Sequence, residues 1–390
     1  MDSKKTSWLA VSALAIGLAG CGSSNSNSPG SGGGAVSSSG SDGSAGGVVV
    51  PDARAADGGC QSGDTKACTT FTTPTGITLV LGPYGAAMDP NVGTGFENPV
   101  AAQDEPDAAS ACVNFARIFD QSAALTADLL NTNQDGLALN FALYTVYRPA
   151  TWPAGPIPVI TWGNGTCAQP EGYGALLRYV ASYGFFIVAA NSREVSAGTP
   201  MLHALDYAKA ANADSTSPYY QKLDLTKVGA MGHSQGGMAT VSAATDSRVQ
   251  DVIIFNAADS CTKPFLAISG DKDITGFTPS TMASAADSAP APGAWIYYYD
   301  PIGTGPNGSG NLDGHLVLMT QPNRVTGPAV AWWQMVFQSS ATATSEFVGA
   351  NCGLCDGDVS TYAYGEHDLP PGSVADAGPT GDDASATGDP

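Results

Sequence analysis

Short apolar runs alternate along this chain with longer segments in which apolar residues recur every three or four positions. The runs predict buried strands and the periodic segments predict helices. We expect strands at 137–148, 157–162, 185–190, 227–231, 252–256, 265–269 and 294–299. We expect helices at 172–183, 199–213, 235–244 and 327–337. Continuously apolar strands that alternate with helices are typical of a mostly parallel sheet with helices on both faces, so we predict an α/β fold.

The N-terminal segment has a different pattern. Lys4 and Lys5 precede a short apolar run from Trp8 to Ala19, which predicts a signal peptide over residues 1–20. The run ends in Leu-Ala-Gly-Cys and resembles a bacterial lipobox. That resemblance implies cleavage before Cys21 and a lipid anchor on its thiol. An ordinary secretory signal is the alternative. We therefore expect export, to the cell envelope with the anchor or as a secreted protein without it.

Two further segments lack the apolar content of a folded core. Residues 21–59 are dominated by Ser and Gly and predict a flexible tether, and residues 368–390 form an acidic, Pro- and Gly-rich tail. One folded domain remains between them, at 60–367.

The charge balance limits the partners. The 390 residues include 35 Asp and Glu against 15 Lys and Arg, for a net charge of −20. Such a chain has no basic surface for phosphates, so nucleic acid is not an expected partner. An acidic protein also disfavours anionic substrates, which indicates neutral ones.

Eight cysteines are present, and seven remain when Cys21 is assigned to the lipid. Export favours disulfides, and the odd number leaves at least one thiol free or paired elsewhere. Zinc binding by Cys352-x-x-Cys355 has weak support, because no second pair or nearby histidine accompanies it.

A G-x-S-x-G motif spans Gly232 to Gly236 (GHSQG). By itself it is weak, because a chain this rich in Gly and Ser contains about half an occurrence by chance. Its place between a buried strand and a helix is the one required of a nucleophile elbow, a sharp turn that presents a serine hydroxyl over the sheet edge. We predict Ser234 as the nucleophile. The alternative is a Gly-rich helix start capped by Ser234.

A serine nucleophile needs a histidine base and an orienting acid, in the chain order Ser, acid, His. Only His315 and His367 follow Ser234, and we predict His315 because it lies on a loop before the last helix rather than beside the tail. For the acid, Asp271 and Asp273 both follow the strand at 265–269. We favour Asp273, with Asp271 as the alternative. His203 precedes Ser234 in a predicted amphipathic helix and is assigned a structural role, and His233 lies inside the elbow, where we expect its side chain to point away from the site.

Two backbone N–H groups are needed for an oxyanion hole. Gln235, at the start of the elbow helix, supplies one. The loop after an earlier strand, Trp162-Gly-Asn-Gly, supplies the other. We predict the Asn164 N–H, with Gly163 as the alternative donor, and a plain Gly-rich turn as the alternative to a functional loop.

The elbow sequence VGAMGHSQGG (228–237) resembles the α/β-hydrolase superfamily over about 137–338. Within it, the chain is similar to bacterial cutinase-like polyester hydrolases, the group that includes PET hydrolases, at GPYG (82–85), GALLRYVASYGFFIVAANS (174–192), MLHALDYA (201–208) and VAWWQMVF (330–337). It is also similar to chlorophyllase-like and dienelactone-hydrolase-like esterases, in which a loop such as GNGT (163–166) is not unusual.

The resemblance implies an α/β-hydrolase fold that cleaves esters through Ser234, Asp273 and His315. Polyester hydrolases usually carry an aromatic residue where Asn164 stands and Met where Gln235 stands. They also carry a Trp after the strand that follows the nucleophile, where this chain reads NAADSC (256–261). These departures fall on positions of the substrate clamp and leave the Ser–Asp–His residues unaffected.

Hydrolases of this superfamily often insert a lid between the two strands joined by 256–264, and that link is short here. We therefore expect little or no lid and a cleft open to bulky substrates. Cys167 and Cys261 fall on loops near the expected site, where a disulfide between them would stiffen the rim.

These observations predict an exported serine hydrolase of neutral carboxylic esters, with polyesters as one substrate class left open. We expect a monomer that needs no metal or organic cofactor and meets the membrane through its lipid anchor. Two alternatives stay open: an amide or peptide hydrolase with the same triad, and a surface binding protein that keeps the fold without the chemistry.

Overall fold

A computed structural model describes residues 59–61, 63–73, 76–98, 139–195, 197–257, 261–271, 273, 276–299, 314–355 and 362–369. The strands are β1 (Gly59–Gln61), β2 (Thr70–Thr72), β3 (Thr78–Val80), β4 (Ala86–Val92), β5 (Tyr144–Pro149), β6 (Ile157–Gly163), β7 (Phe186–Ala190), β8 (Leu223–His233), β9 (Asp251–Phe255), β10 (Phe265–Gly270), β11 (Gly293–Tyr298) and β12 (Tyr362–His367). The helices are η1 (Pro170–Tyr173), α4 (Gly174–Ala181), α5 (Thr199–Ala213), α6 (Gln235–Ala243), α7 (Pro279–Asp287), α8 (Val317–Thr320), α9 (Pro322–Gln338) and α10 (Ala341–Phe347).

A large mixed sheet forms the centre of the described region. Its strand order is β12-β11-β10-β9-β8-β6-β7-β5-β4, with nine strands among the described residues. The central pairs from β7 through β6, β8, β9 and β10 to β11 are parallel. The pairs β5–β7, β4–β5 and β11–β12 at the two edges are antiparallel. The sheet is therefore mostly parallel, as expected, with antiparallel edges that the apolar pattern did not indicate.

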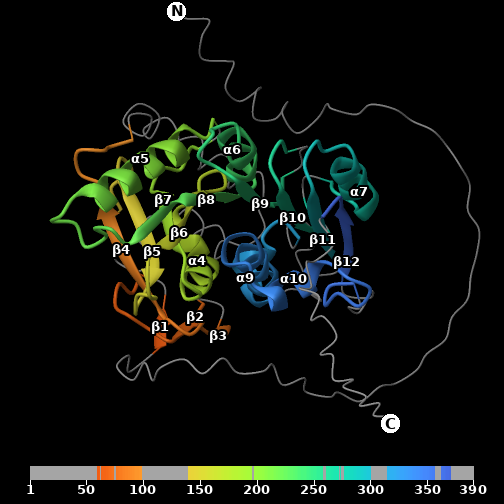
Figure 1. The fold of residues 1–390 in the computed structure, drawn as a ribbon, viewed down its shortest axis with the longest axis horizontal. Helices are drawn as coiled ribbons and strands as arrows, with labels where there is room; N and C mark the ends of the chain where they lie inside the picture. The colour runs from red at the N-terminus through yellow and green to blue at the C-terminus, as the bar shows by residue number, and fades with distance from the viewer. Residues whose placement is uncertain are drawn as a thin grey trace, which may run out of the picture. The chain divides into compact units, whose positions relative to one another are not determined.

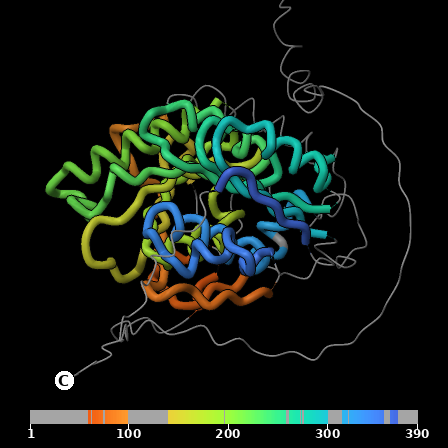
Figure 2. Tube along the Cα trace, turned by 45° about the vertical axis from the view of Figure 1, so that its right-hand side comes forward, coloured from red at the N-terminus to blue at the C-terminus, as the bar shows by residue number. Residues whose placement is uncertain are grey.

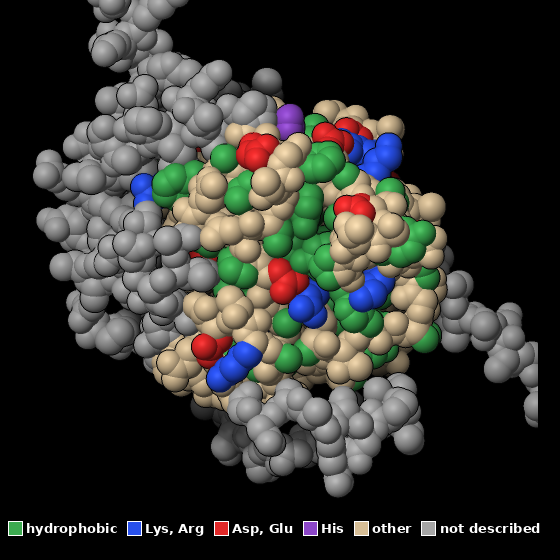
Figure 3. Space-filling view, turned by 90° about the vertical axis from the view of Figure 1, so that its left-hand side faces the viewer, with side chains coloured by type: hydrophobic (Ala, Val, Ile, Leu, Met, Phe, Trp, Pro, Cys, Tyr) green, Lys and Arg blue, Asp and Glu red, His purple; other side chains and the backbone are tan. Residues whose placement is uncertain are grey.

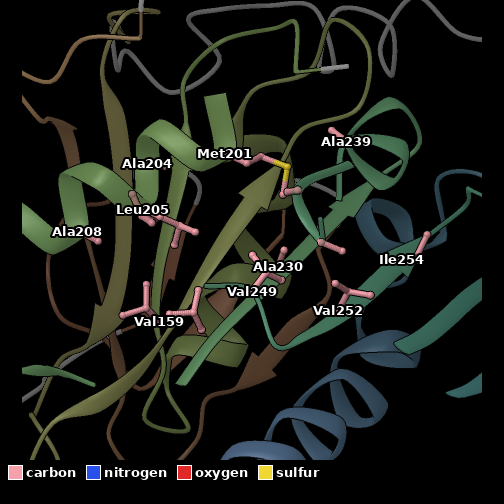
Figure 4. Packing of buried hydrophobic residues seen from close by; sticks show 14 of the residues in the cluster. Val159, Met201, Ala204, Leu205, Ala208, Ala230, Ala239, Val249, Val252 and Ile254 are labelled. Atoms are coloured by element: carbon pink, nitrogen blue, oxygen red, sulfur yellow. The ribbon is translucent and has the colours of Figure 1, made fainter. Parts of the chain in front are cut away.

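Helices cover both faces of this sheet: α5, α6 and α7 lie on one side, and α4, α9 and α10 lie on the other (Figure 1). Successive strand residues enter opposite layers, since side chains alternate along a strand. Val159 packs with Met201 and Leu205 of α5 in the first core, whereas Ile160 packs with α4 and α9 in the second. Figure 4 shows the first core, in which β-branched strand side chains meet small residues of α5 and α6. This two-sided burial explains the continuously apolar strands.

A small sheet of β1, β2 and β3 lies beside α4 (Figure 2). Phe71 of β2 and Ala175 of α4 share its core. Gly59, which the sequence assigned to the tether, is already the first residue of β1.

Several predicted bounds change. The strand expected at 137–148 is β5, which begins only at Tyr144, and the helix expected at 172–183 is divided into η1 and α4. The last predicted helix, α9, begins at Pro322 and contains Pro328 in its interior. The helix at 199–213 has the predicted ends. Strand β12 was not predicted, because its half-exposed residues give no continuous apolar run.

Basic side chains are scattered on the face shown in Figure 3, and several lie beside acidic ones. Arg148 binds Asp89 at 2.6 Å, and Arg248 binds both Asp206 and Asp246. The basic side chains on the face in Figure 3 are therefore scattered rather than gathered into a patch, and the ion pairs of Arg148 and Arg248 neutralise two of the basic groups of the described residues.

Candidate active site

Ser234 lies on a sharp turn between the end of β8 and the start of α6. Its backbone has φ 55° and ψ −117°, a conformation that non-glycine residues rarely adopt. The Ser234 N–H donates to the Phe255 carbonyl at 2.9 Å, which fixes the turn to the neighbouring strand β9. A strained serine at a strand-to-helix turn is the geometry of a nucleophile elbow.

Two motif glycines are required by close backbone approach. A Cβ on Gly232 would lie 2.2 Å from the Gly236 carbonyl oxygen, inside the same turn. A Cβ on Gly236 would lie 2.0 Å from the carbonyl oxygen of Gly163, at the end of β6. The missing side chains therefore let the elbow helix start directly against the loop that follows β6.

Replacing Gly236 by alanine is expected to lower the free energy of unfolding by about 3 kcal/mol, because backbone on both sides must shift to admit the methyl group. Urea unfolding measures this change. Gly327→Ala is the matched control, since Gly327 is an exposed residue of α9, and an added Cβ would meet no atom within 4 Å apart from its chain neighbours and the backbone of its own helix. The control should stay within about 1 kcal/mol of wild type, because the helix propensity of alanine and its clash with the following Pro328 oppose each other. Equal stability of the two variants would contradict this account of the elbow.

His315 connects Ser234 to Asp273. Its Nε2 lies 3.0 Å from Ser234 Oγ, and its Nδ1 lies 2.8 Å from Asp273 Oδ1. His315 and Asp273 are both buried, and Ser234 is half-buried. A carboxylate can only accept, so Nδ1 carries the proton that is donated to Asp273. Nε2 is then free to accept the proton of the Ser234 hydroxyl.

The second oxygen of Asp273 is held by the sheet. Asp273 Oδ2 accepts from Asn256 Nδ2 at 2.6 Å and from Ser269 Oγ at 2.9 Å. Asn256 follows β9, and Ser269 lies at the end of β10. Three donors therefore fix the carboxylate in the orientation that meets His315 Nδ1.

The two alternative triad residues lie in other environments. Asp271 accepts from the Tyr297 hydroxyl at 2.9 Å. His367 ends the edge strand β12 with its Nε2 3.3 Å from Asp368 and its Nδ1 3.9 Å from Asp287. Hydrogen bonds thus join Ser234, Asp273 and His315, and these two residues have different partners.

The loop after β6, predicted to carry an oxyanion donor, is anchored by the Asn164 side chain. Asn164 Nδ2 donates to the carbonyls of Ala190 and Ser192, and Asn164 Oδ1 accepts from Trp162 Nε1. The next backbone group, Gly165 N–H, donates to the Tyr173 hydroxyl at 2.9 Å. The Gly165 N–H therefore already has an acceptor within the protein. The alternative donors Asn164 and Gly163 lie against the first turn of α6, where Asn164 O would be 2.6 Å from a Cβ on Gly236.

Gln235 follows the nucleophile as the first residue of α6. Its Nε2 donates to Glu194 at 2.8 Å, and its Oε1 accepts from the Val195 N–H at 3.4 Å. The side chain is thus tied to the loop after β7, while its backbone N–H belongs to the helix N-terminus.

Sequence reasoning missed four residues that support the site: Asn256, Ser269, Tyr173 and His233. A signal existed for the first two, because both are polar residues where central parallel strands end, at the edge where such sheets place their sites. No pattern identified Tyr173 in η1.

His233 is buried between Tyr173 and the His315 backbone. Burial, with a smaller contribution from nearby His315, lowers the pKa of His233 from 6.5 to about 3. Its Nδ1 lies 3.0 Å from the Tyr173 hydroxyl, and its Nε2 lies 2.7 Å from the His315 carbonyl oxygen. His233 is therefore neutral in the folded protein at neutral pH.

This depressed pKa predicts a loss of stability in acid. Between about pH 6.5 and pH 3 the unfolded chain binds a proton at His233 that the folded protein does not, so the free energy of unfolding falls as pH falls. The slope from this group approaches about 1.4 kcal/mol per pH unit, and it vanishes above pH 6.5. Urea titrations of wild type and His233→Gln at several pH values measure it. The stability gap between them should narrow as pH falls, and a constant gap would contradict the prediction.

Disulfides Cys60–Cys68 and Cys352–Cys355 are present among the described residues. They indicate an exported protein, and the second shows that Cys352-x-x-Cys355 forms a disulfide rather than a zinc site. The suggested Cys167–Cys261 disulfide is wrong: Cys261 is a buried free thiol, and Cys167 is disulfide-bonded without it. Cys261 is fully buried in the first apolar core.

Other predictions lie outside the described residues: the signal peptide over 1–20, Cys21, most of the tether at 21–59 and the tail after Leu369. In the described part of the chain, no helix is long and apolar enough to span a bilayer. Within that same part, no group of three or more His, Cys, Asp or Glu residues could hold a metal ion.

One family model matches part of this chain. The segment of this chain that the family model covers runs from residue 140 to residue 292. It contains Asn164, Ser234, Gln235 and Asp273. His315 lies beyond its end. The match supports an ester-bond hydrolase in general. Over residues 140–292 the chain matches the family model of PETase, the PET hydrolase-like proteins, which confirms its resemblance to cutinase-like polyester hydrolases.

Proposed function

We propose that this protein is an exported serine hydrolase of carboxylic esters with the α/β-hydrolase fold. The observation that carries the proposal is the chain of hydrogen bonds from Ser234 Oγ through His315 to Asp273, at 3.0 and 2.8 Å, with the serine on a strained turn. A serine hydroxyl is a weak nucleophile at neutral pH, and a base held by an acid is what activates it.

In the proposed reaction, Ser234 Oγ attacks the acyl carbon of the ester while His315 Nε2 takes the hydroxyl proton. Asp273 stabilises the imidazolium that forms. His315 then gives the proton to the leaving alcohol as the ester C–O bond breaks. Water attacks the acyl-enzyme by the same route, and the acid is released with Ser234 restored.

Negative charge develops on the carbonyl oxygen in both steps. We assign its stabilisation to the backbone N–H groups of Gln235 and Asn164. Gln235 begins helix α6, so its N–H lies at the positive end of the helix dipole. The Asn164 side chain is buried, and three hydrogen bonds of its amide anchor the loop beside α6. One such donor contributes about 3 kcal/mol to the transition state.

We further propose a cleft with little or no lid, a monomeric protein and attachment to the membrane by an acylated Cys21. The net charge of −20 supports neutral esters over anionic ones, and it supports a protein without nucleic acid partners. Polyesters are the bulkiest substrates in this class, and an open cleft would admit them.

A substrate panel tests the proposed function. Purified protein is assayed on p-nitrophenyl esters of increasing acyl length, on a matched p-nitroanilide and on a polyester film. We expect kcat/KM for the short neutral esters to exceed that for the anilide. A larger kcat/KM for the anilide would assign the site to amides instead, and no turnover of any substrate would favour a binding protein.

A further inference from the structure

A continuous line of buried hydrogen bonds joins the loop after β6 to the backbone of His315. Gly165 N–H donates to the Tyr173 hydroxyl at 2.9 Å. The Tyr173 hydroxyl lies 3.0 Å from His233 Nδ1, and His233 Nε2 lies 2.7 Å from the His315 carbonyl oxygen. Tyr173 and His233 are 1% and 3% exposed, so water does not compete for these groups.

Only one arrangement of protons satisfies every member of this line. The His315 carbonyl can only accept, so His233 Nε2 carries a proton. The Tyr173 oxygen already accepts from Gly165, so its own proton is donated to His233 Nδ1. His233 must then be neutral with a bare Nδ1. A second proton on its ring would turn Tyr173 into a double acceptor and leave the tyrosine proton without this partner.

The charges around His233 favour the same state. It is faced by Tyr173 from η1, and by His315 and Asp273 of the triad. The rings of His233 and His315 have centroids 4.8 Å apart. A neutral His233 therefore adds no positive charge beside His315 when that ring becomes an imidazolium.

A second side chain holds the His315 loop from the sheet. Asn256 Nδ2 donates to the Gly314 carbonyl at 2.8 Å as well as to Asp273. The carbonyl groups of Gly314 and His315 are thus fixed by two different residues. These two bonds hold the backbone from which the His315 ring projects, while Asp273 holds the ring itself.

We propose that Tyr173 and His233 are positioning residues, which hold the loop after β6 and the backbone of His315 at a fixed distance from each other. They do so through the line of hydrogen bonds from Gly165 N–H to the His315 carbonyl, which we call the relay. This inference rests on the proposed function. The relay sets the distance between the base, which takes the Ser234 proton, and the oxyanion donors, which bind the substrate carbonyl oxygen. These groups come from segments far apart in the chain. Both side chains are buried, so we assign them no contact with the substrate.

Tyr173→Phe removes the relay with little change of volume. We expect kcat for a short p-nitrophenyl ester to fall by about ten- to a hundred-fold with KM nearly unchanged, because small misplacements of catalytic groups cost rates of this size. His233→Phe should lower kcat equally. His233→Gln should recover part of it, since an amide can both donate to His315 and accept from Tyr173. The double variant Tyr173→Phe/His233→Phe should be no worse than either single one.

Tyr219→Phe is the matched control, because Tyr219 is an equally buried tyrosine whose hydroxyl donates to Asp89 at 2.7 Å. It should lose stability while its kcat stays within about two-fold of wild type. Wild-type kcat in Tyr173→Phe, or additive losses in the double variant, would overturn the proposal.

Nitrogen NMR of histidine-labelled wild type tests the relay without any assay of activity. We expect His233 as the neutral Nε2–H tautomer from about pH 5 to pH 8. A charged ring, or the Nδ1–H tautomer, would overturn the proposal even if the relay variants fail to fold. The NMR result does not depend on the proposed function, because it needs no substrate. The proposed function is tested separately, by whether wild type hydrolyses esters.

Discussion

Replacing Ser234 by alanine is expected to lower kcat for a short p-nitrophenyl ester by about 10⁶-fold, the size of loss seen when a serine hydrolase loses its nucleophile. The physical reason is that no other group replaces the Ser234 oxygen, which lies 3.0 Å from the base and is presented by the strained turn. KM should change little, because the alanine methyl group is smaller than the serine side chain and fits in the same space. Steady-state kinetics on purified protein measure both.

Ser242→Ala is the matched control. Ser242 is an exposed serine of the same helix, α6, and its hydroxyl only donates to the Met238 carbonyl at 3.2 Å. We expect wild-type kinetics from it. Retained esterase activity in Ser234→Ala would show that Ser234 is not the nucleophile, whatever the control shows.

Replacing Asp273 by asparagine is expected to lower kcat by about 10⁴-fold while the fold persists. Asn256 and Ser269 both donate to Oδ2 of Asp273. In the variant these two donors hold the amide oxygen on their side, so the amide NH₂ faces His315 Nδ1. That NH₂ can only donate, and it forces the proton of His315 onto Nε2. His315 then cannot accept the proton of Ser234.

Asp271→Asn distinguishes this explanation from a general effect of charge. Asp271 is two residues away and accepts from Tyr297 rather than from His315. We expect kcat within about three-fold of wild type, because an amide oxygen still accepts from the tyrosine. Equal losses in Asp271→Asn and Asp273→Asn would mean that the acid acts through its charge and not through the tautomer of His315.

The sequence predicted the parts of the fold that are set by local pattern. Strands β6, β7, β9 and β10 are apolar on both faces, and such runs are visible without knowledge of their neighbours. Edge strands are different. Strand β12 has mostly half-exposed side chains, and it is a strand because it pairs with β11 from Gly293 to Tyr298. Its formation depends on a partner far away in the chain, which no local pattern reports.

The site divides in the same way. Ser234 could be predicted because the elbow is a local motif, and Asp273 and His315 could be predicted because chain order and strand ends limit the choice. Asn256, Tyr173 and His233 act through contacts between segments far apart in sequence. The pairing of cysteines also depends on which distant segments meet in the fold. The suggested Cys167–Cys261 disulfide was wrong for that reason.

The central claim is that His315 activates Ser234 as a nucleophile. Wild type, Ser234→Ala and His315→Gln are treated with a fluorophosphonate probe, and the labelled residue is identified by peptide mass spectrometry. We predict rapid labelling of wild type on Ser234, none on Ser234→Ala, and labelling of His315→Gln slowed by at least about a hundred-fold. Labelling of Ser234 at the same rate in wild type and His315→Gln, or no labelling of wild type, would contradict the account.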